Sequence, residues 1–230
     1  MTDYTALYDI IRPGVQASAI AMWPHIDRVY QEITGRHPYS VLDVGCGEGW
    51  WGRIGVEEGW VDRATGIDGP WGGRAINAEH HPERGLDFIG LCLDEIPEDA
   101  LPIVDVSGNR YDIALCLEVA EHLADPDPLV RWLTMCADVV VFSAAIPGQP
   151  GAGHVSCRWQ AQWAEAFEAV DDWAAADMIR PAIWRNHEIE WWYRQNVFVA
   201  YTLPHAERTT HREVLSMVHP EMWAVRHDCR

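Results

Sequence analysis

The chain has 230 residues, and its 35 acidic and 17 basic residues leave a formal net charge of −18. This charge argues against partners bound through a phosphate backbone or an anionic membrane surface, because lysine and arginine carry that binding. The chain has no apolar run of about 20 residues, no secretory leader pattern and no CxxC pair among its cysteines, so we expect a reduced, cytoplasmic protein with no membrane span.

Short apolar runs alternate with helical patterns after an N-terminal helix predicted at residues 15–33. Strands are expected at residues 40–44, 64–67, 86–91, 111–116 and 139–142, and helices at 50–58 and 127–136. This alternation predicts an α/β protein with a parallel sheet and helices on both faces. Such sheets bind their ligands at the carboxyl ends of the strands.

The alternation ends after Pro147. A helix is predicted at residues 156–170, followed by an aromatic segment at 183–195 and a last strand at 196–201, antiparallel at the far side of the sheet. The tail from Pro204 is polar and is expected to be a loosely attached helix or a partly disordered segment.

The strongest motif is VLDVGCGEGWWG at residues 41–52, in which Gly45, Gly47 and Gly49 join a buried strand to a helix. Glycine lets the backbone turn tightly and approach a ligand, and the following helix begins with unpaired N–H donors. Asp68 ends the next strand, where a carboxylate can accept both hydroxyls of a ribose. The motif therefore predicts a nucleoside-containing cofactor.

Two cofactor classes share this geometry. A dinucleotide loop needs its third glycine where this chain has Trp50, and Glu48 opposes a pyrophosphate at the helix N-terminus. Asp43 is a second carboxylate that suits an ammonium or sulfonium group. These residues favour S-adenosylmethionine, with a nicotinamide-dependent reductase as the alternative.

Four blocks together resemble the class I S-adenosylmethionine-dependent methyltransferases of the small-molecule type. They are VLDVGCGEGWWG, TGIDG (65–69), FIGLCLDE (88–95) and RYDIALCLEVAEHL (110–123), and the resemblance covers roughly residues 39–146. It implies a Rossmann-like, seven-stranded sheet. It also divides the chain into an N-terminal helical segment (1–38), a methyltransferase domain (39–203, with a cofactor half to 146 and an acceptor half from 147) and a tail (204–230).

The resemblance also implies roles for individual residues. Asp43 is expected near the methionine ammonium, Asp68 at the ribose, and Gly69 and Pro70 at the edge of the adenine. Cys92 stands where the family usually has aspartate, so the carboxylate contact to the adenine amino group is either lost or supplied by Asp94 or by the backbone. The full expected cofactor set is Asp43, Gly45, Cys46, Gly47, Gly49, Trp50, Asp68, Gly69, Cys92, Leu93, Leu117 and Glu118.

Catalysis on a hydroxyl group needs a base near the acceptor. His154 is the first candidate and His122 the second, because an imidazole titrates near neutrality; a structural role for His154 is an equal alternative. No metal is predicted, since His80 and His81 are adjacent and the tail histidines lack an HxxxH spacing.

The acceptor half is rich in tryptophan. Residues 153–163 and 179–196 resemble segments of bacterial and phage methyltransferases associated with sugars and natural products. Five indoles there offer flat surfaces for a sugar or planar ring: Trp159, Trp163, Trp184, Trp191 and Trp192. Core packing is the competing explanation, and we favour it for Trp192 and Tyr193.

These patterns predict methyl transfer from S-adenosylmethionine to an oxygen of a small polar acceptor such as a sugar or glycoside. Nitrogen is the lesser alternative to oxygen. A non-catalytic, methyltransferase-like binding subunit is the alternative from a different functional class. No nucleic-acid or membrane partner is expected, because no basic stripe is present, and the oligomeric state is left open.

Overall fold

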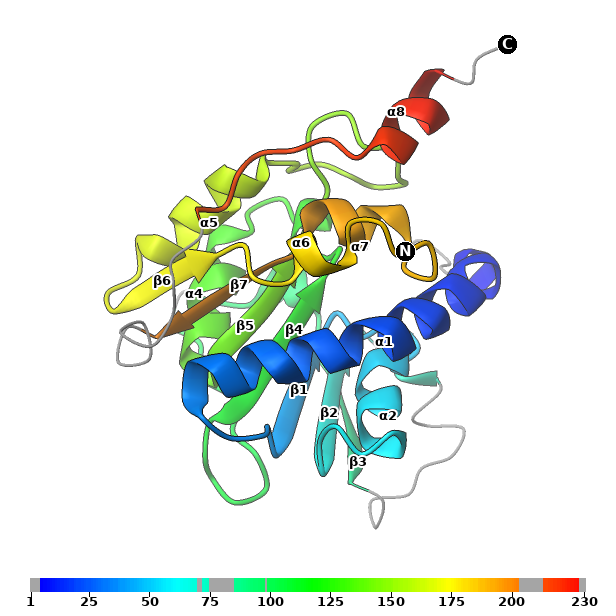
Figure 1. Ribbon diagram of the computed structural model, residues 1–230. Coiled ribbons are helices and arrows are strands. Elements are labelled where there is room, and N and C mark those ends of the chain that lie inside the picture. The colour runs from blue at the N-terminus through cyan, green and yellow to red at the C-terminus, as the bar shows by residue number, and fades with distance from the viewer. Residues whose placement is uncertain (1–4, 70–71, 75–84, 98, 203–212, 228–230) are drawn as a thin grey trace.

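The computed structural model describes residues 5–69, 72–74, 85–97, 99–202 and 213–227. Its strands form a seven-stranded sheet in the order β3-β2-β1-β4-β5-β7-β6, seen edge to edge in Figure 1. The strands are β1 (Ser40–Val44), β2 (Arg63–Asp68), β3 (Leu86–Gly90), β4 (Tyr111–Leu117), β5 (Ala137–Ser143), β6 (Trp173–Ala176) and β7 (Phe198–Thr202). The sequence-based prediction of a Rossmann-like sheet is confirmed.

Helices connect the strands. They are α1 (Thr5–Thr34), α2 (Trp50–Glu57), α4 (Asp127–Cys136), α5 (Gln160–Glu168), α6 (Arg180–Ile183), α7 (Trp191–Asn196) and α8 (Pro220–His227), with short 3-10 turns η2 (Leu93–Glu95) and η3 (Ala120–His122). The tail therefore contains a helix, α8. None of the described helices is long and apolar enough to cross a membrane.

The sheet is parallel from β3 to β5 and antiparallel at β7. The predicted antiparallel strand exists and lies beyond β5, on the side of the sheet away from β3, but it is not the edge strand. β7 lies between β5 and β6, and β6 is the edge strand. The WAAA sequence of β6 was missed because alanine has no strand preference and the segment has no polar alternation.

Successive side chains of the buried strands point to opposite faces of the sheet and pack into two apolar layers. Val41 points into a layer formed with α1, α2, α6 and α7, and its neighbour Leu42 points into the opposite layer with α4 and α5. Figure 1 shows α1 lying across one face of the sheet. The predicted arrangement of helices on both faces is present.

α1 is ten residues longer at its N-terminus than the predicted helix, which begins at residue 15, because the structure continues the helix through Pro13. Its C-terminal half belongs to the core, where Met22, Trp23 and Ile33 are fully buried. The Trp23 indole N–H also donates to the Trp51 carbonyl at 2.9 Å. Its N-terminal half extends to the carboxyl edge of the sheet, where it forms part of the site described next.

Candidate active site

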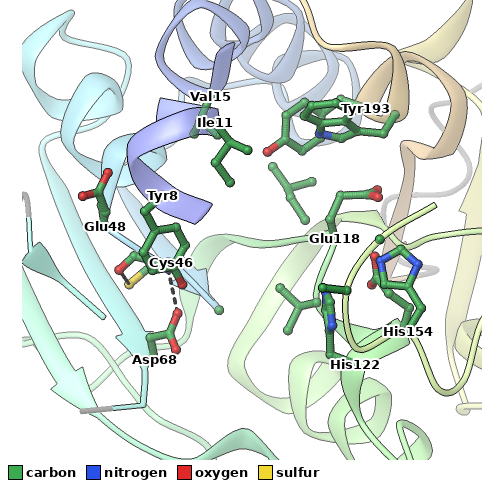
Figure 2. A pocket seen from close by; sticks show the side chains of 18 of the residues that line it. Tyr8, Ile11, Val15, Cys46, Glu48, Asp68, Glu118, His122, His154 and Tyr193 are labelled. Atoms are coloured by element: carbon green, nitrogen blue, oxygen red, sulfur yellow. Dashed lines mark hydrogen bonds between the residues drawn. The ribbon is translucent and has the colours of Figure 1, made fainter. Parts of the chain in front are cut away.

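A cavity of about 540 Å³ opens at the carboxyl edge of the parallel strands. Figure 2 shows its two ends: Asp68, Cys46 and Tyr8 lie at one, and Glu118, His122 and His154 at the other. The loops after β1, β2, β3, β4 and β5 form the floor and sides, while α1, α7 and Val225 of α8 supply the remaining wall. The site lies where the topology of such a sheet predicts it.

The glycine loop is built so closely that side chains are excluded. Gly45 and Gly47 have φ angles of +70° and +55°. A Cβ on Gly45 would collide with Val119, and a Cβ on Gly47 would lie 3.2 Å from the Tyr8 ring. At Gly45 and Gly47 the loop therefore presents bare backbone to the cavity.

Asp68 is held by backbone N–H groups. One carboxylate oxygen accepts from Gly47 N at 2.7 Å and the other from Gly69 N at 2.6 Å. The side chain is buried yet borders the cavity, so its remaining lone pairs are oriented before a ligand arrives. The role of Asp68 at the ribose stays a prediction, and Pro70, which is expected at the edge of the adenine, lies outside the described residues.

Most of the expected cofactor residues line the cavity: Gly45, Cys46, Gly47, Trp50, Asp68, Gly69, Cys92, Leu93, Leu117 and Glu118. Asp43 and Gly49 do not. Asp43 is buried behind the loop, where it accepts from Gly52 N at 3.3 Å. Burial raises the pKa of Asp43 to about 7, so its role toward a methionine ammonium stays a prediction.

The sequence analysis treats Glu48 as a negative charge that opposes a pyrophosphate, but the structure shows this carboxylate in an ion pair. Its two oxygens accept from Arg12 Nε and Nη2, both at 2.7 Å, and Trp50 Nε1 donates to it at 3.1 Å. Arg12 lowers the pKa of Glu48 and neutralises its charge. Glu48 therefore does not act as an isolated negative charge against a pyrophosphate, and that reason for preferring one cofactor class was wrong.

Glu118 stands at the end of β4 with a φ angle of +56°. Its carboxylate accepts from Gln149 Nε2 at 2.8 Å and from Asn196 Nδ2 at 2.9 Å. Burial raises its pKa, and the two amides keep the carboxylate in place. The carboxylate lines the cavity on the side of His122 and His154 (Figure 2).

The two candidate bases come together although they are far apart in the sequence. The His122 and His154 rings lie 5.0 Å apart, centre to centre. The loop that carries His154 is fixed to η3, because Val155 N and Ser156 N both donate to the Glu121 carbonyl, at 2.8 and 3.1 Å. Burial lowers the pKa of both imidazoles, which favours their neutral forms.

The aromatic prediction holds for part of the set. Trp191, Trp192 and Tyr193 of α7 line the cavity. Trp192 and Tyr193 also contact the core, so the core-packing alternative describes one side of each ring. Trp163 is buried on the opposite face of the sheet, and neither Trp159 nor Trp184 is part of the cavity wall.

Comparison with known families decides the identity. The sequence model of a family described as "Methyltransferase domain" matches residues 22–201. The chain belongs to this family. S-adenosylmethionine is therefore the cofactor of this methyltransferase, and the nicotinamide alternative is set aside. The cavity fits that molecule, since it combines the buried Asp68 carboxylate with a loop in which a Cβ on Gly45 would collide with Val119 and a Cβ on Gly47 would crowd Tyr8.

Curated relatives of this methyltransferase match over part of their length. A ubiquinone biosynthesis O-methyltransferase of Pasteurella multocida is 27% identical over 122 residues, covering 50% of this chain and 50% of that protein. Its counterpart in Pectobacterium atrosepticum is 31% identical over 129 residues, covering 55% and 45%. The chain thus spans about half the length of the curated relatives it matches.

Solved structures share the fold of this methyltransferase. The plantazolicin methyltransferase BamL, in complex with a triazolic desmethylPZN analog and SAH, has a TM-score of 0.58 at 14% identity, covering 86% of this chain and 89% of that one. The plantazolicin methyltransferase BpumL, in complex with SAH, has a TM-score of 0.55 at 16% identity, covering 86% of each chain. These likenesses establish the architecture.

The sequence analysis missed the contribution of α1 to the site. Tyr8, Ile11, Arg12 and Val15 line the cavity. The only available signal was the apolar residues before Pro13, and the proline itself argued against a helix there. Glu121 also lines the cavity, and no pattern in the sequence assigned it a role there.

Proposed function

We propose that this methyltransferase transfers the methyl group of S-adenosylmethionine to an oxygen of a small, flat acceptor with hydroxyl groups, such as a sugar or glycoside. The main support is that one cavity joins the glycine loop and Asp68 to the Glu121, His122 and His154 cluster. The relatives described above are O-methyltransferases, which favours oxygen over nitrogen.

The chemistry divides between cofactor and protein. When bound, S-adenosylmethionine supplies a methyl group whose S–C bond breaks as the acceptor oxygen forms an O–C bond, so the sulfonium becomes a neutral thioether and the hydroxyl proton is released. The protein's task is to hold the two reactants in line. Orientation of this kind contributes on the order of 7–11 kcal/mol.

Each end of the cavity has a distinct task. Asp68 and the backbone of Gly47 hold the nucleoside end, and Glu118 is held by Gln149 and Asn196 at the point between the two reactants. Trp191 and Trp192 offer faces on which a sugar or a planar ring stacks. A general-base role for His154, or for His122, stays a prediction.

A phenolic acceptor is the second candidate. The indole wall and the apolar side chains of Ile11, Val15 and Leu93 around the cavity favour an aromatic ring as much as a sugar face. A panel that contains both glycosides and phenols separates the two classes.

The direct test is calorimetric titration with S-adenosylmethionine and S-adenosylhomocysteine, followed by transfer of a labelled methyl group to the acceptor panel. Asp68→Asn is expected to weaken cofactor binding by roughly tenfold or more, because it removes a charged acceptor of hydrogen bonds. An intact wild-type fold that binds neither compound contradicts the proposal. Binding with no turnover on any acceptor supports the non-catalytic alternative.

A further inference from the structure

The carboxylate of Glu121 is the most anomalous group in the cavity. The side chain is fully buried, and neither of its oxygens makes a hydrogen bond of ordinary geometry to the described residues, although the Glu118 carboxylate and the backbone of Ala145 lie close to it. Burial and the nearby Glu118 charge raise the pKa of Glu121 well above its usual range. A buried carboxylate without a partner costs several kcal/mol, so this position favours either a proton or a cation.

Two imidazoles lie within reach of this carboxylate. One ligand atom from each of Glu121, His122 and His154 falls within 4.8 Å of the other two. The His122 Nδ1–H donates to the Gly153 carbonyl at 3.3 Å, which leaves the Nε2 lone pair for a ligand. Nδ1 of His154 is buried and has no partner among the described residues.

The backbone holds these side chains close together. The Glu121 carbonyl accepts from Val155 N and Ser156 N, and Ser156 Oγ donates to the Leu123 carbonyl at 2.7 Å. The His154 ring also packs directly on Gly151, where a Cβ would collide with it. Residues from two separate loops are therefore kept at one point before any ligand binds.

We propose that Glu121, His122 and His154 bind one divalent cation at the acceptor end of the cavity. Two imidazole nitrogens and one carboxylate suit a first-row ion such as Mn²⁺, Fe²⁺ or Zn²⁺ better than Ca²⁺, which prefers oxygen ligands. Metal–ligand bonds of about 2.1 Å place ligand atoms roughly 3–3.5 Å apart. The three ligand atoms lie within 4.8 Å of one another, so the side chains move closer together on binding.

The consequence for the reaction rests on the proposed function. Three protein ligands leave coordination positions open, and an acceptor hydroxyl in one of them is held toward the methyl group and loses its proton to water more readily. In this arrangement His154 and His122 are ligands and take no proton. The cation site departs from the sequence-based expectation of no metal, because the sequence does not show that the two histidines meet.

The test is Mn²⁺ binding by the full chain after treatment with EDTA and removal of the chelator. Loss of the free Mn²⁺ signal in electron paramagnetic resonance and calorimetric titration measure affinity and stoichiometry. We expect one ion per chain. Glu121→Gln and His154→Ala should each raise the Kd by about tenfold or more. Glu165→Gln and His187→Ala, whose side chains are exposed, should leave it unchanged.

Titration of the same proteins with S-adenosylhomocysteine separates this inference from the proposed function. Cofactor binding without binding of Mn²⁺, Zn²⁺ or Mg²⁺ overturns the cation site alone. Ion binding that Glu121→Gln and His154→Ala leave unchanged overturns it as well. If the protein binds the ion but not S-adenosylhomocysteine, the proposed function is contradicted while the cation site is supported.

Folding and catalysis give two further controls. Thermal unfolding shows whether Glu121→Gln is folded. If it is not, the test relies on His154→Ala, because His154 lies in a partly exposed loop where the substitution is easier to tolerate. Methyl transfer that is unaffected by EDTA and is lost in His154→Ala indicates the general base and contradicts a metal ligand.

Discussion

Gly45 and Gly59 have the same left-handed backbone conformation but differ in the space around a Cβ atom. Comparing them separates the cost of backbone strain from the cost of a steric clash. Gly45 and Gly59 have φ angles of +70° and +75°. A Cβ on Gly45 would collide with Val119, whereas a Cβ on Gly59 would meet nothing within 4 Å. Alanine at either position has the cost of left-handed backbone, about 1–2 kcal/mol, and only Gly45→Ala adds steric overpacking.

We therefore predict that Gly45→Ala lowers the free energy of unfolding by about 1–3 kcal/mol more than Gly59→Ala. It should also weaken binding of S-adenosylhomocysteine, while Gly59→Ala leaves binding unchanged. Urea unfolding and calorimetry measure the two effects. Equal losses for both variants would show that the contact with Val119 contributes nothing.

The buried Asp43 carboxyl makes the free energy of unfolding depend on pH. Burial is the main cause of its pKa of about 7, with a smaller contribution from the charge of Asp68. The folded state thus holds a proton that the unfolded chain releases near pH 4. Its contribution to stability is complete below pH 4, falls as the pH rises, and is lost above pH 7.

We predict that Asp43→Asn stabilises the cofactor-free protein at pH 8 relative to wild type, and that the gain shrinks toward pH 5. The interval between the two pKa values sets an upper limit of roughly 4 kcal/mol. Urea unfolding at both pH values measures the gain. A gain that is the same at pH 5 and pH 8 would show that Asp43 does not titrate in this range.

At the scale of elements, the N-terminal half of α1 joins the site to the rest of the fold. Arg12 binds Glu48 through two hydrogen bonds of 2.7 Å, and Tyr8 lies against Gly47. Both contacts hold the glycine loop against a helix whose other half is anchored in the core. α1 therefore helps to shape the cofactor end of the cavity.

We predict that Arg12→Ala weakens binding of S-adenosylhomocysteine by roughly tenfold, because the buried Glu48 carboxylate loses its ion pair beside the loop. Arg28→Ala, on the same helix but away from the cavity, should leave affinity unchanged. In Arg12→Ala/Glu48→Gln, affinity should recover in part. A double variant as weak as the sum of the single effects would argue against the pair.

The elements differ in how well their sequences predict them. β1, β4 and β5 are predominantly apolar and almost entirely buried, so their sequences alone indicate strands. β6 has no such signal, and pairing with β7 makes it a strand. The start of α1 was placed too late because Pro13 lacks an N–H, and the structure accommodates it inside the helix.

At the scale of the whole molecule, the charge of −18 produces repulsion between the exposed carboxylates. Residues 86–128 carry eleven acidic residues and one arginine, a net charge of −10. The described part of this stretch runs from β3 to the start of α4, beside the cavity. This acidity suits a cofactor that carries a sulfonium.

We predict that the Tm at pH 8 rises by roughly 2–4 °C between 0.05 and 0.5 M NaCl, because salt screens this repulsion. Near the pI of 4.8 the same change in salt should have little effect, since the net charge is close to zero. Scanning calorimetry at both pH values measures the difference. An equal response at the two pH values would argue against charge repulsion as the cause.

The sequence by itself determined the sheet, the glycine loop, the Asp68 carboxylate and the cofactor class, because these depend on short segments whose residues are neighbours in the chain. Only the tertiary structure decided which distant residues meet. It closed the cavity with α1, directed Trp191 and Trp192 inward while burying Trp163 on the other face, and joined Glu121 and His122 to His154. The carboxyl ends of β4 and β5 are adjacent in the sheet, and that pairing brings together loops about 30 residues apart in the sequence.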